Sequence, residues 1–346
     1  IVKQDKSIKH RILHTGQHFD TRMNGIFFQD LNIPKPDKNL GINSGTNIEN
    51  TALMMMGIEQ AFKEWTPNLI VVYGDTDSTL AGALVAMKMH IKLAHMEAGC
   101  RSGDMRMQEE VNRMAVDSLA DLLLFPSKCS ANSYRLAPHQ TGVFVGDLML
   151  DSLNRIIDQV KWKENDVLCL IGRKYAKREY NLLSIHRAEN TDDKTILQGI
   201  LSAINQSTDK PTFLLMHPRL SKQMDKFGLT LPPSILPIEP QHYHNNLKLI
   251  AGAYKVITDS GGMQKESYWL KTPCVTLRDN TEWPETLCND RNILAGTDRE
   301  RIKQAIRMKQ IFAPPKDPGL LFGSGLGAKT ALHAIKTFLN TNLGIV

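Results

Sequence analysis

Acidic residues follow two apolar strands in the first third of the sequence. Asp75 ends the strand LIVVYGD, and Glu97 ends a second strand that also carries His95. The carboxyl ends of parallel strands meet at one edge of a sheet, where α/β proteins bind their ligands. Glu109 begins a helical pattern soon afterwards, and Arg113 lies one turn along it. Acids grouped in this way suit a reaction that removes a proton on one side of a bond and protonates a leaving group on the other.

A second group of signals lies in the other half of the chain, in the motif TDSGGMQKE. A strand ends there, and Ser260, Gly261 and Gly262 open a helix. Backbone N–H groups at such a turn form an anion site of the kind that holds phosphates. Glu266, one turn into the helix, could accept hydrogen bonds from ribose hydroxyls. The same turn could also be no more than a helix N-cap.

Two further strand ends strengthen the anion interpretation. IHRAEN places His186 and Arg187 at the start of a helix, and MHPR places His217 in a similar position. Strand ends carrying His, Arg or Gly-Gly on one edge indicate a diphosphate pocket. A single histidine is weaker evidence, and His95, which alternates with Met96 at its strand end, could equally be a hydrogen-bonded core residue.

The elements that must position these residues alternate between strand and helix. Continuous apolar strands such as LIVVYG are typical of a parallel sheet covered on both faces. The fold class predicted is α/β, with two Rossmann-like, doubly wound domains at residues 1–150 and 151–328 and a ligand held between their strand ends. In the first domain we expect strands at 11–14, 69–73, 91–96, 121–125 and 143–145, and helices near 20–30 and at 49–64, 77–89, 109–119 and 127–135. In the second we expect strands at 181–186, 212–217, 255–260 and 273–278.

Composition narrows the class of partner. The 346 residues carry a net charge of only +6, without a long Lys/Arg block, so a nucleic-acid partner is not expected. No apolar run is long enough to span a bilayer. The five cysteines are scattered and show no metal-ligand spacing. We therefore predict a soluble, cytoplasmic protein that binds small anions, with no metal.

Seven motifs, in order, carry a resemblance to a known family. The chain closely resembles the UDP-N-acetylglucosamine 2-epimerase family, in its non-hydrolysing bacterial and archaeal branch. The motifs are HTGQHFD (14–20), GDTDST (74–79), HMEAGCR (95–101), QEEVNR (108–113), HRAEN (186–190), TDSGGMQKE (258–266) and RDNTEWPET (278–286).

The resemblance implies a glycosyltransferase-B arrangement in which a C-terminal helix, about 329–341, packs back on the first domain. It also implies a homodimer without cofactor that interconverts UDP-GlcNAc and UDP-ManNAc, by anti elimination of UDP and re-addition through a 2-acetamidoglucal, for polysaccharide precursor synthesis. By motif, the catalytic residues would be Asp75, Glu97, Glu109 and His186. The substrate-binding residues would be Gln17, His18, His95, Arg113, Arg187, His217, Ser260, Gly261, Gly262, Glu266 and Glu282.

The sequence departs from the family pattern in two places. The family's first strand and its GxRP loop are absent, and we expect them to exist in the native protein. Trp283 stands where many bacterial members have Arg, and it would supply a flat apolar surface at a cleft edge. In this residue the chain is more similar to the branch acting on UDP-2,3-diacetamido-2,3-dideoxyglucuronate, or to the archaeal enzymes. Two further activities fit the same architecture, those of a hydrolysing epimerase and of a glycosyltransferase.

Overall fold

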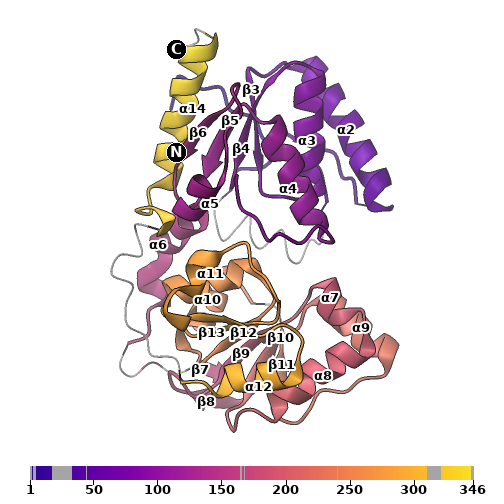
Figure 1. The fold of residues 1–346 in the computed structure, drawn as a ribbon, viewed down its shortest axis with the longest axis vertical. Coiled ribbons are helices and arrows are strands. Elements are labelled where there is room, and N and C mark those ends of the chain that lie inside the picture. The colour runs from indigo at the N-terminus through magenta and orange to yellow at the C-terminus, as the bar shows by residue number, and fades with distance from the viewer. Residues whose placement is uncertain are drawn as a thin grey trace. The chain divides into compact units, whose positions relative to one another are not determined.

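The chain forms two compact units (Figure 1). The first comprises Ile1–Asn154 and Asp317–Val346, and the second Arg155–Lys316. The structure, a computed structural model, describes residues 2, 5–17, 33–43, 45–163, 166, 168–239, 241–309 and 321–343. The helix expected near 20–30 lies outside the described residues.

The first unit is built on a four-stranded parallel sheet in the order β3-β4-β5-β6. A separate parallel pair, β1 and β2, completes its described strands. The strands are β1 (Leu13–His14), β2 (Lys38–Asn39), β3 (Leu69–Tyr73), β4 (Lys92–Met96), β5 (Leu122–Phe125) and β6 (Thr141–Phe144). The helices are α2 (Asn47–Glu64), α3 (Asp77–Lys88), α4 (Gln108–Leu119), α5 (Lys128–Ser133), α6 (Leu148–Val160) and α14 (Gly327–Leu343).

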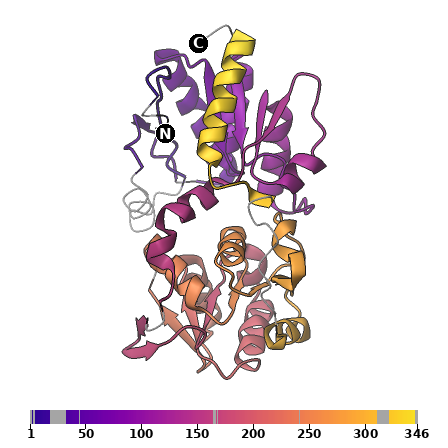
Figure 2. The ribbon, with the colours of Figure 1, turned by 90° about the vertical axis from the view of Figure 1, so that its left-hand side faces the viewer.

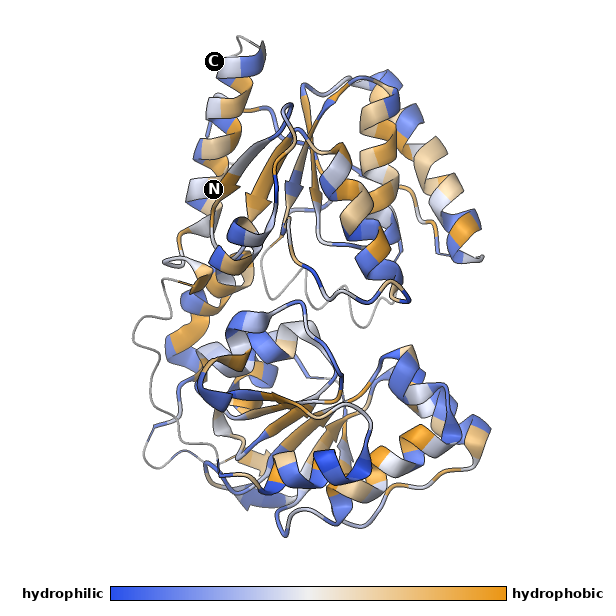
Figure 3. Ribbon diagram, viewed as in Figure 1, coloured by the Kyte–Doolittle hydropathy of each residue, from blue (hydrophilic) through white to orange (hydrophobic). Residues whose placement is uncertain are grey.

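Successive residues of each central strand point to opposite faces of this sheet, and both faces are covered. Leu123 and Phe125 pack into a core with residues of α2, α3 and α4. Leu122 and Leu124 pack instead with the apolar side of α14, which Figure 2 shows running beside the sheet. This double burial explains why β3 and β5 are continuous apolar runs, and Figure 3 colours much of the sheet as hydrophobic.

The second unit contains a six-stranded sheet in the order β11-β10-β9-β12-β13-β14, with every pair parallel. Figure 1 shows α10 and α11 on the opposite side of this sheet from α8 and α12. The strands are β9 (Asn181–Ser184), β10 (Thr212–Leu215), β11 (Ile235–Ile238), β12 (Val256–Thr258), β13 (Cys274–Thr276) and β14 (Asn292–Leu294), and β7 (Leu168–Leu170) and β8 (Arg173–Tyr175) form an antiparallel hairpin. The helices are α7 (Ala188–Thr191), α8 (Lys194–Asn205), α9 (Pro218–Phe227), α10 (Tyr243–Gly252), α11 (Gly261–Trp269), the 3₁₀ helix η2 (Pro284–Asp290) and α12 (Arg299–Arg307).

Three features of the second unit were not expected from the sequence: β11, β14 and the β7–β8 hairpin. β11 and β14 are the two outer strands of their sheet. Pro237 interrupts the apolar pattern of β11. An outer strand tolerates proline because it pairs with a neighbouring strand on one side only, so some of its N–H groups have no strand partner.

A buried lysine anchors the end of α12. Lys255 precedes β12 and is 1% exposed. Its Nζ donates to the carbonyl oxygens of Ala305 and Ile306 at 2.7 Å and of Met308 at 2.6 Å. These carbonyls lie at the helix C-terminus, where the chain has no intrahelical donor for them.

Replacing Lys255 with Met should lower the free energy of unfolding of the second unit by roughly 2 kcal/mol, because buried carbonyl oxygens lose their donor. Urea unfolding followed by tryptophan fluorescence measures this, since three of the four tryptophans lie in that unit. Lys303→Met is the control, because Lys303 pairs on the same helix with Glu300, which is 70% exposed. Equal destabilisation by both substitutions would contradict the anchoring role.

A histidine caps α9. The ring Nδ1 of His217 accepts the backbone N–H of Arg219 at 3.1 Å. Burial, followed by the charge of the neighbouring His186, lowers the pKa of His217 below its ordinary value of 6.5. The folded protein therefore binds a proton at His217 less readily than the unfolded chain does. The contribution of this difference to the free energy of unfolding is complete above pH 6.5 and is lost as the pH falls through the lowered pKa.

His217→Asn should make the free energy of unfolding less sensitive to acid between pH 7 and pH 5. Asparagine is a good N-cap and takes up no proton in this range. Urea unfolding at several pH values compares the two proteins, which should differ progressively toward the acid end. Identical pH dependence would show that His217 does not resist protonation in the folded state.

Candidate active site

The acids of the first unit follow paired residues at one edge of its sheet. Tyr73, which ends β3, is in register with Met96, which ends β4. The N–H of Gly74 also donates to the carbonyl of Met96 at 3.1 Å. Asp75 and Glu97 therefore leave neighbouring strands at the same edge, as the sequence predicted.

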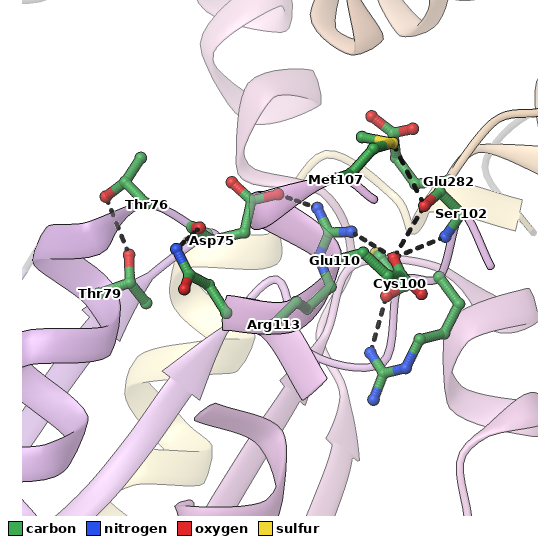
Figure 4. Close-up of polar contacts among 12 residues, drawn as sticks. Asp75, Thr76, Thr79, Cys100, Ser102, Met107, Glu110, Arg113 and Glu282 are labelled. Carbon is green, nitrogen blue, oxygen red and sulfur yellow. Dashed lines mark hydrogen bonds and ion pairs between the residues drawn. The ribbon is translucent and has the colours of Figure 1, made fainter. Parts of the chain in front are cut away.

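Asp75 is oriented by residues of α4. Its carboxylate pairs with the guanidinium of Arg113, and its backbone carbonyl accepts from the amide of Asn112 at 3.0 Å (Figure 4). Arg113 is only 2% exposed and also lies 3.5 Å from a carboxylate oxygen of Glu110. The arginine therefore belongs to an internal network that positions Asp75.

The side chains of the motif QEEVNR, at the start of α4, contact different partners. Gln108 and Asn112, four residues apart, donate to Asp77 at 2.8 and 3.1 Å. Glu110 is 1% exposed and accepts the N–H groups of Ser102 at 2.8 Å and Gly103 at 3.1 Å. These contacts hold the loop before α4 (Figure 4).

Glu109 is the acid of this motif that the helix turns outward. It is exposed, in contrast to the buried Glu110 beside it. A solvent-accessible carboxylate at the start of α4 is available to a ligand, whereas Glu110 already serves the loop.

Glu97 has an unusual backbone. Its φ of +70° lies in the left-handed region, which costs a residue with a side chain of order 1–3 kcal/mol and is common at functional sites. A pocket of about 100 Å³ lies beside it, lined among others by Tyr73, Met96, Pro126 and Met149. Glu97 therefore lies at a small, mostly apolar pocket at the strand edge.

Three predicted binding residues of this unit have other surroundings or lie outside the described residues. His95 is fully buried, with its ring nitrogens 2.6 Å from Asp117 and 2.8 Å from the carbonyl of Gly74, so it lies behind the edge instead of facing a ligand. The side chain of Gln17 accepts the N–H and hydroxyl of Ser78 at 3.0 and 2.6 Å, at the start of α3. His18 lies outside the described residues.

In the second unit, residues that follow adjacent strands meet around a buried carboxylate. Asp259, after β12, is fully buried and accepts the backbone N–H groups of His186 at 3.0 Å and Arg187 at 2.9 Å, both after β9. It also lies 3.0 Å from Nδ1 of His186. Burial alone would raise the pKa of the Asp259 carboxyl, but its bonds with His186 and Asn190 outweigh this and hold the pKa below its usual range.

The two histidines of this edge lie together. The ring centroids of His186 and His217 are 5.2 Å apart, and each ring has one nitrogen already bound within the protein. Because Nδ1 of His186 faces Asp259, its Nε2 is the atom that remains for a ligand.

The N-terminus of α11 has the features of an anion site. Ser260 caps the helix by accepting the N–H of Met263 at 3.5 Å. Gly261 has no room for a side chain, because a Cβ there would lie 2.6 Å from Oε1 of Glu282 and 3.0 Å from Nε1 of Trp283. The site is compact and polar. It consists of the helix N–H groups at Gly261 and Gly262 with the side chains of Glu282 and Trp283 close by.

Two arginines flank the same site. Arg187 lies 3.6 Å from one oxygen of Glu282, and Arg278 donates to the other at 2.7 Å. Glu282 is 8% exposed and Glu266, within α11, is 4% exposed. The cations and the helix terminus supply the positive potential that a phosphate requires.

The expectation for Trp283 was wrong. The side chain is 2% exposed, and Nζ of Lys265 lies 3.7 Å from the centre of its ring. A lysine held over an indole face is a favourable cation–π pair, so the buried ring does not supply the flat apolar surface expected at a cleft edge.

Sequence reasoning missed several residues of these sites: Glu110, Asp117, Asp259 and Arg278. Asp259 and Arg278 lie within motifs that had been singled out for other residues. Asp117 had a weaker signal, its position four residues after Arg113 on the same face of α4.

Two kinds of feature are absent from the described part of the chain. It holds no group of three or more His, Cys, Asp or Glu residues placed to bind a metal ion. None of its helices combines the length and apolar character needed to cross a membrane.

The chain is similar to known 2-epimerases of UDP-sugars. A UDP-N-acetylglucosamine 2-epimerase from Methanococcus maripaludis is 40% identical over 347 positions, covering 97% of this chain and 93% of that protein. A UDP-2,3-diacetamido-2,3-dideoxy-D-glucuronate 2-epimerase from Pseudomonas aeruginosa is 38% identical over 334 residues, covering 94% and 90%.

The fold has a close counterpart among solved structures. The crystal structure of Methanocaldococcus jannaschii UDP-GlcNAc 2-epimerase in complex with UDP-GlcNAc and UDP matches with a TM-score of 0.85 at 34% identity, covering 97% of this chain and 94% of that one. This confirms the predicted fold class, two Rossmann-like domains of the glycosyltransferase-B type. The family model for UDP-N-acetylglucosamine 2-epimerase matches residues 1–336. The chain therefore belongs to the UDP-N-acetylglucosamine 2-epimerase family, a family of isomerases.

Proposed function

We propose that the protein is a non-hydrolysing UDP-N-acetylglucosamine 2-epimerase that interconverts UDP-GlcNAc and UDP-ManNAc for polysaccharide precursor synthesis. The observation that carries this proposal is the group of acids at the carboxyl edge of the first sheet, in a chain of this family. Asp75 and Glu97 leave paired strands, and Glu109 is exposed at the start of α4.

Several acids are needed because the proton at C2 of the sugar is weakly acidic, with no adjacent carbonyl to stabilise a carbanion. A base removes this proton while the bond between C1 and the diphosphate oxygen breaks, and its electrons leave with UDP. A C1–C2 double bond remains, giving 2-acetamidoglucal. UDP then adds back to C1 as a proton is delivered to the opposite face of C2. Elimination and re-addition together involve no net oxidation and need no cofactor.

We assign the acid and base roles to Asp75, Glu97 and Glu109 without choosing the C2 base among them. Arg113 supports this set by orienting Asp75, to which it is paired. His95 supports it from the core, since it contacts the backbone of Gly74 just before Asp75.

In this proposal the second unit binds the UDP portion. The departing diphosphate gains negative charge, and the N-terminus of α11 at Ser260, Gly261 and Gly262 is suited to stabilise it. Arg187 and His186 would contact the diphosphate, and Glu266 the ribose. His217 would complete this edge, with its ring against that of His186.

The second candidate substrate is UDP-2,3-diacetamido-2,3-dideoxyglucuronate. It is favoured by the relative from Pseudomonas aeruginosa, whose 38% identity is close to the 40% of the Methanococcus maripaludis enzyme. Both substrates carry an acetamido group at C2, so the same elimination applies to either.

We also infer a cytoplasmic homodimer. Large apolar side chains on α2, Ile48 at 83% and Met56 at 66%, are exposed and would gain from burial against a second copy. The described structure has its five cysteines as free thiols, which suits a reducing compartment.

Glu97→Gln should abolish exchange of the C2 proton while UDP affinity stays within about threefold of wild type, because an amide can serve as neither the acid nor the base of the reaction. The protein is incubated with UDP-GlcNAc in deuterated water, and proton NMR follows deuterium entry at C2 and the appearance of UDP-ManNAc. Glu109→Gln should have the same effect, whereas Glu110→Gln should mainly lower the free energy of unfolding by loosening the loop at Ser102.

Wild-type exchange in Glu97→Gln would contradict this site. Free ManNAc as the product would identify a hydrolysing enzyme. Activity only with the diacetamido glucuronate would identify the second candidate substrate.

Arg187→Met should weaken UDP binding by about 10- to 100-fold, because a charge-assisted contact to phosphate is lost. Isothermal titration calorimetry with UDP measures this directly. Arg219→Met is the matched control: Arg219 follows the neighbouring strand but pairs with Asp192 at 2.6 Å, and both side chains are more than 40% exposed. If both substitutions weaken UDP binding equally, general charge loss explains the effect and Arg187 has no specific role.

A further inference from the structure

A fully buried carboxylate on α4 binds both ends of the turn that carries Glu97. Oδ1 of Asp117 lies 2.6 Å from Nδ1 of His95, two residues before Glu97. Oδ2 accepts the backbone N–H of Gly99, two residues after it, at 3.0 Å. Asp117 therefore bridges the five-residue segment from His95 to Gly99.

The segment that Asp117 bridges has a strained backbone that is closely packed. Glu97 has its φ of +70°, and Gly99 also lies in the left-handed region at +76°. A Cβ at Gly99 would lie 2.8 Å from the ring of Phe125 and 3.0 Å from the carbonyl of Ser130, so the turn is pressed against β5 and α5. The contacts of Asp117 hold this strained turn in place.

The histidine partner of Asp117 must be doubly protonated. Nδ1 of His95 faces the carboxylate, and Nε2 lies 2.8 Å from the carbonyl oxygen of Gly74. Both partners only accept hydrogen bonds, so both ring nitrogens must donate. Because Gly74 directly precedes Asp75, this buried imidazolium links the strand ends that carry the two acids.

The charges of the cluster are compatible with such burial. Arg101 also contacts Asp117, at 2.6 Å. Burial by itself would raise the pKa of the Asp117 carboxyl, but the hydrogen bond and charge of His95, together with Arg101, hold the pKa below its usual range. An ionised carboxylate between two cations satisfies the requirement that buried charges be paired.

We propose that Asp117, acting through the buried ring of His95, is a positioning residue that sets the geometry of Glu97 and Asp75 for proton transfer. The inference rests on the proposed function, in which these two acids act at the sugar. Proton transfer is sensitive to placement, and a shift of about 1 Å can cost on the order of 100-fold in rate.

Asp117→Asn tests the proposal, because it keeps the shape of the side chain and replaces one acceptor with a donor. We expect kcat for C2 proton exchange to fall by about 10- to 100-fold, with KM and UDP affinity within about threefold of wild type. Imidazole ¹⁵N NMR should show His95 doubly protonated in the wild-type protein. In the variant the ring should become neutral with its proton on Nε2, because the new amide can donate to Nδ1.

Asp121→Asn is the matched control. Asp121 follows α4, accepts the N–H of Leu93 on β4 at 2.9 Å and pairs with Lys92 at 2.7 Å, but it does so at the amino end of the strand. It should leave kcat within about threefold of wild type. Should Asp117→Asn fail to fold, His95→Gln provides the second variant and should show the same separation of kcat from KM.

Wild-type kcat in folded Asp117→Asn, or a neutral His95 ring in the wild-type protein, would overturn the inference. So would a loss of kcat matched by an equal loss in Asp121→Asn. Glu97→Gln measured in parallel separates the two levels: if that variant is fully active, the proposed function fails. If it is inactive while Asp117→Asn is fully active, only the role of Asp117 fails.

Discussion

In each unit, the site depends on one fully buried aspartate that binds a histidine and the backbone after a strand. Asp117 does this in the first unit, with His95 and Gly99, and Asp259 does it in the second, with His186 and Arg187. A carboxylate in the core is tolerated only when its charge and hydrogen-bonding capacity are met. The segments that meet this demand are held in one arrangement, and they are the segments that carry the candidate functional groups.

The two aspartates affect their sites in different ways. His95 has both nitrogens bound within the core and cannot reach a ligand, so Asp117 acts on the acids through the backbone. The side chain of His186 is 33% exposed, and Asp259 occupies only its Nδ1, which leaves the outer nitrogen of an oriented ring. One unit therefore holds a strained turn for acid chemistry, and the other holds an imidazole and a helix terminus for an anion.

How far the sequence predicts such sites depends on the kind of signal. Strands buried on both faces are long apolar runs, so the ends that carry Asp75, Glu97 and His186 could be located from the pattern alone. The outer strands β11 and β14 could not, because an edge strand has fewer apolar neighbours and admits residues such as Pro237.

Side-chain direction was the harder part of the prediction. Two adjacent glutamates at the start of α4 look alike in sequence, yet helical geometry buries Glu110 against a loop and exposes Glu109. Trp283 was expected to supply a flat apolar surface at a cleft edge, but its ring is buried and packs on Lys265, a contact that requires the three-dimensional fold. Motif identity located the edge of the sheet, and only the fold determines which way each side chain points.

The pairing of charges also bears on which sugar the first unit accepts. The diacetamido substrate is a glucuronate, so its C5 carboxylate needs a cation, whereas GlcNAc carries no charge on the sugar. Among the described residues at this edge, Arg113 is shared between Asp75 and Glu110, and Arg101 is bound to Asp117. Moving Arg101 to a uronate would remove one of the two cations beside the buried carboxylate of Asp117, and moving Arg113 would remove the cation shared by Asp75 and Glu110. The pairing seen at this edge therefore favours the neutral sugar of UDP-GlcNAc.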